Sequence, residues 1–385
     1  MNIDNDNNTK EELANNVNPV DGNTKGNKKS RIISFIPYFF IIAIIIVTAM
    51  IVFPNFFFGN GKTENETNQN KPTTPEKPVE PEKPIVSKFK IYDTTSKKRP
   101  YALAVNNTPV AVKVQEGLNN AYIVYEIPTE GFTSRLLAVY KDAPDVTVGT
   151  LRSCRHNFMD YAKDSDAIIV CFGWSHYAFD EFHKKGSDFM NGNESYWASA
   201  FWRSNPEKLA REHTAYTKIS NIDKFTSSHN YYRLDSDISQ FLNYSQSEIN
   251  LDKIEGNKEA NSVKLPYGSV TTTFKYDKNT KMYTRIVNGT VAKDYKTKEP
   301  FTTKNIIIVK VEYNVMPDNY YWNLKTTGTG KGYYITNGRY VPITWKKDER
   351  NSQSKYYYQD GREIEVNDGR TYIEVHITSK SVSIS

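Results

Sequence analysis

Cysteine is scarce in this chain, with only Cys154 and Cys171 among 385 residues and no CxxC pair. Two cysteines can form a single disulfide in an oxidising compartment. Cys171 lies in the apolar run Ala167–Phe172, which favours a small buried hydrophobic side chain over a bridge. Because no cysteine precedes Cys154, the sequence offers no attachment site for the lipid of a lipoprotein.

A concentration of positive charge is also lacking. The formal net charge of +6 falls entirely on residues 62–385, where 45 basic side chains face 39 acidic ones without forming a basic run. Nucleic-acid-binding proteins usually gather Lys and Arg on one face or helix, so no nucleic-acid partner is predicted. The mild excess is compatible with attraction to anionic wall polymers or lipid headgroups.

Charge is absent altogether from the 22-residue segment Ile32–Phe53, which is almost wholly apolar. As a helix this segment would extend about 33 Å, enough to cross a hydrocarbon core of about 30 Å. Its apolar core is longer than that of a secretory leader, and no small-x-small cleavage motif follows it. We expect residues 32–53 to be a retained transmembrane signal anchor.

The flanks of this segment predict its orientation. Four basic residues stand directly before it and one soon after it: Lys25, Lys28, Lys29 and Arg31, against Lys62. The positive-inside bias therefore places residues 1–31 in the cytoplasm, as a disordered tail, and the rest outside. Residues 54–94 contain the run KPTTPEKPVEPEKP, which predicts an extended stalk. The expected location is the cell membrane, with one span and an extracytoplasmic body.

Residues 95–245 alternate between strand and helix patterns, as is typical of a mixed α/β layer domain. We expect helices over Cys154–Ala162 and His176–Lys185, with Ser153 and Ser175 as their N-caps. The expected strands are Tyr101–Val105, Ala121–Tyr125, Ser134–Tyr140 and Ala167–Phe172.

Residues 258–383 show little helical periodicity and many β-forming runs. These runs include Tyr333–Ile335, Arg339–Trp345 and Thr371–Ile377. Dipeptides typical of hairpin turns separate them: Asn288-Gly289, Asn337-Gly338, Asp360-Gly361 and Asp368-Gly369. A mostly antiparallel β domain is predicted here. The fold class expected for the whole chain is α+β, preceded by one transmembrane helix.

Motifs in both parts carry a family resemblance. The first part contains Arg99-Pro100, Gln115-x-Gly117-Leu118, Glu130-Gly131-x-Thr133-x-Arg135, Gly149-x-x-Arg152-Ser153-x-Arg155 and Phe201-Trp202-Arg203, and the second contains Thr329-Gly330-Lys331-Gly332, Asn337-Gly338, Trp345-Lys346-Lys347 and Asp360-Gly361-Arg362. In this order they resemble the YerB-like family of two-domain bacterial envelope proteins, over nearly all of residues 95–380. The resemblance implies a fold and an envelope location, and it implies no established activity.

This chain departs from the family pattern in two places. Better-known members resemble lipoproteins, whereas this chain has an apolar helix as its predicted anchor. Where the family tends to have Pro-His-Asn before a Tyr-Thr pair, this chain has Glu212-His213-Thr214 before Tyr216-Thr217.

Five charged residues make up the best candidate site: Glu126, Glu130, Arg135, Arg152 and Arg155. Arg152 and Arg155 bracket the expected start of a helix, where unpaired amides and the helix dipole favour an anion. Guanidinium groups add paired donors for a carboxylate or a phosphate. The pattern predicts a site for a polar or anionic ligand. The alternative is that the acids and the arginines form structural ion pairs with each other.

Catalysis has weaker support. Glu126 and Glu130 could act as the paired carboxyls of a glycosidase, although any two nearby acids would allow the same interpretation. Gly173-Trp174-Ser175-His176 resembles a nucleophile elbow, but Tyr177 replaces the closing glycine. No catalytic residue is predicted.

Metal and cofactor sites have no better basis. His176, Asp180 and His183 would share one helix face, but a metal site needs further ligands from another element. Thr327–Gly332 fails the GxxxxGK[ST] spacing of a phosphate loop and indicates a glycine-shaped turn or bulge. Neither a metal ion nor a cofactor is predicted.

The leading functional hypothesis is therefore a membrane-anchored, non-catalytic envelope module that binds a polar or anionic ligand, such as a cell-wall component. A cell-wall hydrolase that uses Glu126 and Glu130 is the first alternative. A structural or assembly partner of an envelope complex is the second.

Overall fold

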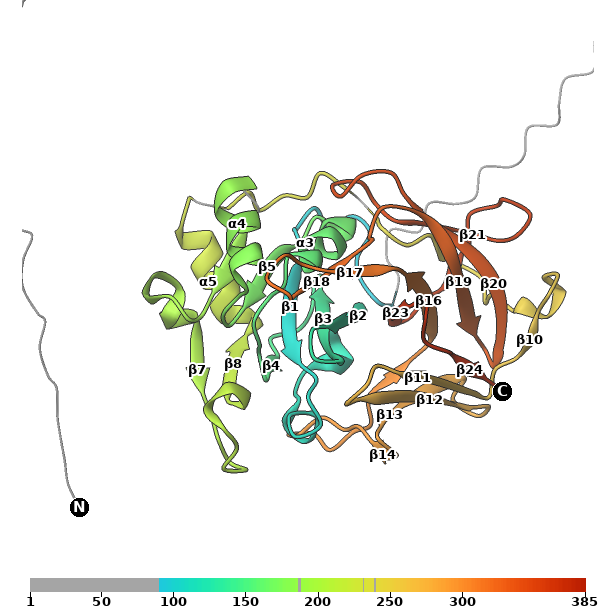
Figure 1. Ribbon diagram of the computed structural model, residues 1–385, viewed down its shortest axis with the longest axis horizontal. Helices are drawn as coiled ribbons and strands as arrows, with labels where there is room; N and C mark the ends of the chain where they lie inside the picture. Colours follow the sequence, from blue (N-terminus) through green and yellow to red (C-terminus); the bar gives the residue numbers. More distant parts are fainter. Residues whose placement is uncertain (1–89, 186–187, 231, 239) are drawn as a thin grey trace, which may run out of the picture. The chain divides into compact units, whose positions relative to one another are not determined.

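The computed structural model describes residues 90–385, apart from 186, 187, 231 and 239. The cytoplasmic tail, the anchor and residues 54–89 of the stalk, all predicted above, lie outside the described residues. Within the described part, every helix is too short or too polar to cross a membrane. The described residues belong to one compact unit, residues 82–385, which contains the hydrophobic core and can therefore be studied as an isolated body (Figure 1).

The first half of the body, up to Lys253, mixes short helices and strands. Its α-helices are α3 (Asn157–Ala162), α4 (His176–Lys185) and α5 (Ile219–Ser228), and its 3-10 helices are η1 (Val112–Val114), η2 (Leu118–Asn120), η3 (Lys163–Ser165), η4 (Ser195–Ala200), η5 (Arg211–His213) and η6 (Leu251–Lys253). Its strands are β1 (Tyr101–Asn106), β2 (Ile123–Thr129), β3 (Thr133–Tyr140), β4 (Thr147–Gly149), β5 (Ile168–Cys171), β6 (Phe189–Asn191), β7 (Phe201–Arg203), β8 (Ala215–Lys218) and β9 (Tyr244–Ser245).

The second half consists of strands and turns. The strands are β10 (Lys258–Glu259), β11 (Ser262–Pro266), β12 (Thr271–Asp277), β13 (Met282–Val287), β14 (Thr290–Val291), β15 (Thr302–Thr303), β16 (Asn305–Val311), β17 (Tyr313–Val315), β18 (Trp322–Leu324), β19 (Gly328–Thr336), β20 (Arg339–Lys347), β21 (Lys355–Tyr357), β22 (Val366–Asn367), β23 (Thr371–Ile377) and β24 (Ser383–Ile384). Together the two halves give an α+β fold.

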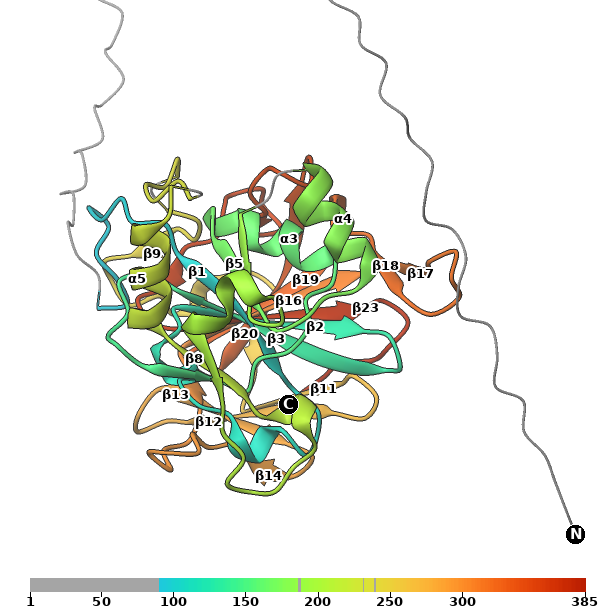
Figure 2. The same cartoon turned by 90° about the vertical axis from the view of Figure 1, so that its left-hand side faces the viewer.

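An eleven-stranded sheet, in the order β10-β20-β19-β16-β23-β2-β3-β1-β5-β6 with β21 beside β20, forms the middle of the body. Figures 1 and 2 show α3 and α4 on one side of this sheet and the smaller sheet of β11, β12 and β13 on the other. Because layers cover both faces, every residue of β1, β2 and β23 is buried. Such strands are expected to be continuous apolar runs rather than alternating ones.

The two halves share this sheet. Strand β2 of the first half pairs in parallel with β23 of the second, from Ile123 beside Thr371 to Glu126 beside Glu374. On its other side β23 pairs in parallel with β16, while most other neighbours are antiparallel. Backbone hydrogen bonds of one continuous sheet therefore connect the halves.

Buried charge also joins the halves. Lys347 Nζ, at the end of β20, donates to Asp164 Oδ1 at 2.7 Å and to the carbonyl of Asp160 at 2.8 Å. Both Lys347 and Asp164 are almost fully enclosed. Asp164 also accepts hydrogen bonds from Ser354 and Tyr125, so its charge is well compensated.

Several local predictions are confirmed. Helix α4 spans His176–Lys185 as expected, and Ser175 Oγ accepts the amide of Ala178 at 3.2 Å. Asn288-Gly289 connects β13 to β14, and Asn337-Gly338 connects β19 to β20. All four of these turn residues have positive φ, as a two-residue hairpin turn of type I′ requires.

Two local predictions are wrong. The helix expected from Cys154 begins only at Asn157, and Ser153 does not cap it. Cys154 instead forms a parallel bridge with Trp174, which keeps the chain extended there. Asp368-Gly369 is not a hairpin turn, because it joins β22 to β23, which pair with different strands. The Asp368 carboxylate accepts the amides of Lys90 and Ile91.

The turn or bulge predicted at Thr327–Gly332 is also wrong, because Gly328–Gly332 lie in strand β19 and pair with β20 in continuous register. A Cβ atom on Gly332 would stand 2.1 Å from the carbonyl oxygen of Ile308, and one on Gly330 would meet the Trp345 ring at 2.5 Å. These glycines allow close packing within the sheet.

Candidate functional site

Glu126 lies inside the body, at the junction of the two halves. Its carboxylate accepts hydrogen bonds from Ser134 Oγ at 2.7 Å, Asn107 Nδ2 at 3.0 Å and Thr272 Oγ1 at 2.8 Å. Arg285 of β13 completes the set, with Nη2 at 3.0 Å, and both charged side chains are fully buried. Glu126 is therefore a satisfied partner in a buried ion pair.

A second carboxyl group lies close to this ion pair. Glu374 of β23 is fully buried, and Tyr267 Oη donates to its Oε2 at 2.8 Å. Burial, together with the negative charge of Glu126, raises the pKa of Glu374 well above its usual range. The environment thus favours the protonated form of Glu374, so that one arginine and two carboxyl groups can share the same interior.

Glu130, Arg135 and Arg155 meet as a compact group. Arg155 Nε lies 2.9 Å from each oxygen of Glu130, Arg155 Nη2 donates to the same carboxylate, and Arg135 Nη2 is 3.8 Å from it. Burial alone would raise the pKa of Glu130, but the hydrogen bond and charge of Arg155 outweigh it and lower that pKa. Burial, reinforced by the charge of Arg155, lowers the pKa of Arg135 to about 9. The main charged contacts of these three side chains are therefore with one another.

Arg152 lies apart from that group and faces a concavity of about 480 Å³, which we call the arginine pocket. Arg152 Nη2 is 3.2 Å from Glu212 Oε1. Arg203 also lines the pocket, stacked with its guanidinium carbon 4.4 Å from the centre of the Phe172 ring. The lining residues are Leu151, Arg152, Ser153, Phe172, Gly173, Trp174, Asn193, Arg203, Arg211, Glu212 and Ala215.

Positive charge dominates the arginine pocket. Arg152, Arg203 and Arg211 line it, and Glu212 is the one acidic residue among the lining residues. Burial, and after it the charge of Arg211, lowers the pKa of Arg203, as expected where like charges approach each other. Arg203 is held in place because its Nη1 donates to the carbonyl of Arg211 at 2.6 Å and to Thr214 Oγ1 at 3.1 Å. The arrangement suits an anion that accepts several hydrogen bonds.

The loop that carries Glu212 is held in place by a contact of the next residue, His213, with the end of β1. His213 Nδ1 is 2.8 Å from Asn106 Nδ2, at the end of β1, and its Nε2 is 3.7 Å from Glu212 Oε1. Burial lowers the pKa of His213, and the charge of Arg152 acts in the same direction. The carboxylate of Glu212 is thereby placed as a counter-ion beside Arg152.

The structure thus divides the five predicted site residues into three places. Glu130, Arg135 and Arg155 come together, Arg152 lines the arginine pocket, and Glu126 pairs with Arg285. The group of Glu130, Arg135 and Arg155 borders the arginine pocket, because Arg135 Nη1 donates to the carbonyl of Ser153, which lines that pocket. Sequence reasoning missed Arg203 and Arg211 as site residues, although Phe201-Trp202-Arg203 was among the motifs that carried the family resemblance.

The histidine-bearing face of α4 has ordinary contacts. His176 Nε2 is 3.5 Å from Asp318 Oδ2, and His183 Nδ1 is 3.0 Å from the carbonyl of Phe179. Within residues 90–385, with the gaps stated above, no group of three His, Cys, Asp or Glu side chains is placed to hold a metal ion.

Family models match both halves of the body. The model described as "Protein of unknown function (DUF3048) N-terminal domain" matches residues 89–232, and that of the "Protein of unknown function (DUF3048) C-terminal domain" matches residues 263–373. The chain belongs to this two-domain, YerB-like family. The resemblance inferred from the motifs is therefore confirmed.

A relative from Bacillus subtilis (strain 168), named "Putative lipoprotein YerB", is 28% identical over 300 residues, which are 77% of this chain and 86% of that protein. The crystal structure of YerB from Bacillus subtilis matches with a TM-score of 0.64 and 28% identity, over 74% of this chain and 94% of that chain. This DUF3048 protein thus shares its fold with the solved YerB structure.

Proposed function

We propose that this DUF3048 protein is a membrane-anchored, extracytoplasmic binding module that holds an anionic envelope ligand, such as a cell-wall component, in the arginine pocket. The observation that carries the proposal is a concavity whose lining includes three arginines and one acidic residue. Such charge attracts anions over a distance and then binds them by paired hydrogen bonds.

The predicted location of the chain at the cell membrane supports the same proposal. The sequence predicts an anchor at 32–53 with its cationic flank inside, and the name of the relative connects that protein with a lipoprotein. A reporter enzyme fused after residue 94 is expected to be active only on the outer side of the membrane. Activity confined to the cytosol would contradict the envelope location.

The hydrolase alternative gains nothing from the geometry. Glu126 is fully enclosed and accepts hydrogen bonds from four side chains, and Glu130 is held by Arg155. A general acid and a nucleophile or base must both reach the scissile bond. These carboxylates are committed to structural partners instead.

The binding test uses the isolated body, residues 82–385, with an anionic wall polymer and with soluble peptidoglycan fragments as probes, measured by calorimetry. Arg152→Ala and Arg211→Ala should each weaken binding about tenfold, because each removes a charged donor. Glu212→Gln should tighten binding, because it removes the competing counter-ion of Arg152.

The matched control is Arg362→Ala, which removes an exposed arginine that pairs with Asp360 at 2.7 Å, away from the pocket. It should leave binding unchanged. If no probe binds, or if the arginine variants bind as the parent does, the proposal fails. A stable membrane protein that co-purifies with the full chain, without any ligand effect, would favour the assembly alternative instead.

A further inference from the structure

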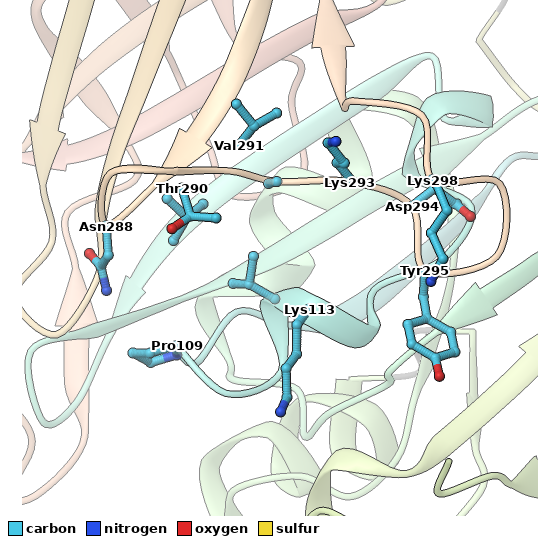
Figure 3. Close-up of a pocket in the computed structure, with 12 residues that line it drawn as sticks. Pro109, Lys113, Asn288, Thr290, Val291, Lys293, Asp294, Tyr295 and Lys298 are labelled. Carbon is cyan, nitrogen blue, oxygen red and sulfur yellow. The ribbon is translucent and has the colours of Figure 1, made fainter. Parts of the chain in front are cut away.

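A second cavity, of about 400 Å³, lies between the two halves of the body. One wall is the segment around Pro109 and Lys113, in the first half, and the other is the loop that follows the Asn288-Gly289 turn. Figure 3 shows Thr290, Val291 and Lys293 along this loop, across from Pro109 and Lys113. We call this cavity the junction pocket.

Hydrogen bonds hold the loop that forms one wall of the junction pocket. Asp294 Oδ2 accepts the amide of Gly117 at 2.7 Å, and its Oδ1 accepts the amides of Lys296 and Thr297 at 3.0 Å. The amide of Tyr295 donates to the carbonyl of Gln115 at 2.8 Å. Backbone hydrogen bonds therefore tie the loop to the opposite half, so the cavity is part of the folded body.

The polar side of the junction pocket is cationic. Lys113, Lys293 and Lys298 line it, and Asp294 is the one acidic residue among the lining side chains. Three amides already occupy the Asp294 carboxylate. Lys113 has a distant partner, Glu207 at 3.8 Å, with both side chains substantially exposed, which makes the pair weak. Lys298 Nζ lies over the Tyr295 ring, 4.1 Å from its centre, so Lys113 and Lys293 supply most of the positive charge that a ligand can use.

The remaining walls are apolar. Val112, Val287 and Ala292 are buried lining residues, whereas Val291 lines the same space and is 38% exposed. An aliphatic side chain left open to solvent inside a cavity offers contact area that a ligand can cover.

We propose that the junction pocket is a second binding site, separate from the arginine pocket, for a small organic anion with a compact apolar body. The lysines receive the anionic group, and Val112, Val287 and Val291 contact the apolar part. Since both halves supply walls, a bound molecule bridges them and stabilises the body against unfolding.

Binding of octanoate to residues 82–385 tests this proposal, with octylammonium and inorganic phosphate as probes that keep only the apolar body or only an anion. Calorimetry and thermal unfolding should show octanoate binding at least about tenfold more tightly than either of the others. Octylammonium or phosphate binding as tightly as octanoate would overturn the proposal.

Variants locate the site. Lys293→Glu reverses a lining charge, and Val291→Glu places a charge on the exposed apolar wall; each should weaken octanoate binding about tenfold. Lys275→Glu makes the same charge change on exposed β12, outside the pocket, and should not alter binding. Arg211→Ala should also leave octanoate binding unchanged. Loss of binding in Arg211→Ala but not in Lys293→Glu would assign octanoate to the arginine pocket and refute the second site.

Discussion

Glu126 and Glu374 are direct neighbours across the parallel pair β2 and β23, and both carboxyl groups are fully buried. Among the residues that the structure describes, Arg285 is ion-paired only to Glu126, at 3.0 Å. Burial and the negative charge of Glu126 both raise the pKa of Glu374, which favours the protonated form of Glu374 beside the charged Glu126. Glu126, which the sequence predicted as a site residue, belongs to the first half of the body. Its neighbour Glu374 and its partner Arg285 belong to the second half, so this group connects the halves.

Removal of the charge on Glu126 should destabilise the folded body strongly. Glu126→Gln removes the ion-pair partner of Arg285, and at a pH low enough for Glu374 to keep its proton it should lower the free energy of unfolding of residues 82–385 by about 3–5 kcal/mol. Urea unfolding measures the change. Glu363→Gln breaks the partly exposed pair with Lys355, at 3.0 Å, and should cost about 1 kcal/mol or less. Equal effects of the two variants would show that the buried pair is dispensable.

Glu374→Gln should have a different signature, visible in the pH dependence. The pKa of Glu374 is raised in the folded state, so above the usual glutamate range the unfolded chain releases a proton that the folded chain retains. Glu374 therefore contributes its full stability at low pH and loses it as the pH rises towards its folded pKa. Glu374→Gln imitates the protonated form and should remove this loss.

The measurement is the difference in unfolding free energy between parent and Glu374→Gln from pH 4 upward, which cancels the titration of other groups. The variant should gain relative to the parent as the pH rises. A constant difference would mean that Glu374 titrates alike in both states.

Gly332 should tolerate no side chain. Gly332→Ala forces a Cβ to within 2.1 Å of the Ile308 carbonyl oxygen in the neighbouring strand, and the resulting shift should cost about 3 kcal/mol. Gly289→Ala meets no atom within 4 Å and carries only the strain of a φ of +83°, about 1 kcal/mol. Chemical unfolding of both variants compares steric cost with backbone strain. A smaller loss for Gly332→Ala than for Gly289→Ala would contradict the packing account of this glycine-rich strand.

Cys154 and Cys171 should behave as protected thiols. Both are free and buried, and burial raises the pKa of the Cys171 thiol well above its usual value, which suppresses the reactive thiolate. A thiol reagent should therefore react with neither cysteine in the folded body and with both after unfolding in denaturant. If protein purified without reductant showed no titratable thiol even when unfolded, the two cysteines would be linked.

Local elements could be predicted from the sequence where local chemistry decides them. Strand β23 has the expected bounds, Thr371–Ile377, because a run rich in β-branched and aromatic residues begins soon after Asp368-Gly369 and gives way to polar residues at Thr378. Helix α4 begins after its cap Ser175, as expected. The start of α3 could not be predicted, because Cys154 forms an isolated bridge with Trp174, a residue some twenty positions away in the chain.

The candidate site was less predictable than the fold, since its partners lie far apart in the chain. Glu126 meets Arg285 across a separation of 159 residues. Arg152 lines a pocket with Arg203 and Arg211, which follow it by about fifty residues or more. Local patterns identify charged residues near turns and helix starts, but only the tertiary fold decides whether their partners are each other or a ligand.

The position of β23 has a consequence for how the protein folds during its synthesis. This strand lies between β16 and β2, yet it occupies residues 371–377 of 385. During synthesis, the edges of β2 and β16 stay open until residues 371–377 have emerged, so this slow, non-local pairing comes late. A chain cut short near residue 370 would expose two hydrophobic strand edges at once, which makes it a ready target for aggregation and for quality-control proteases.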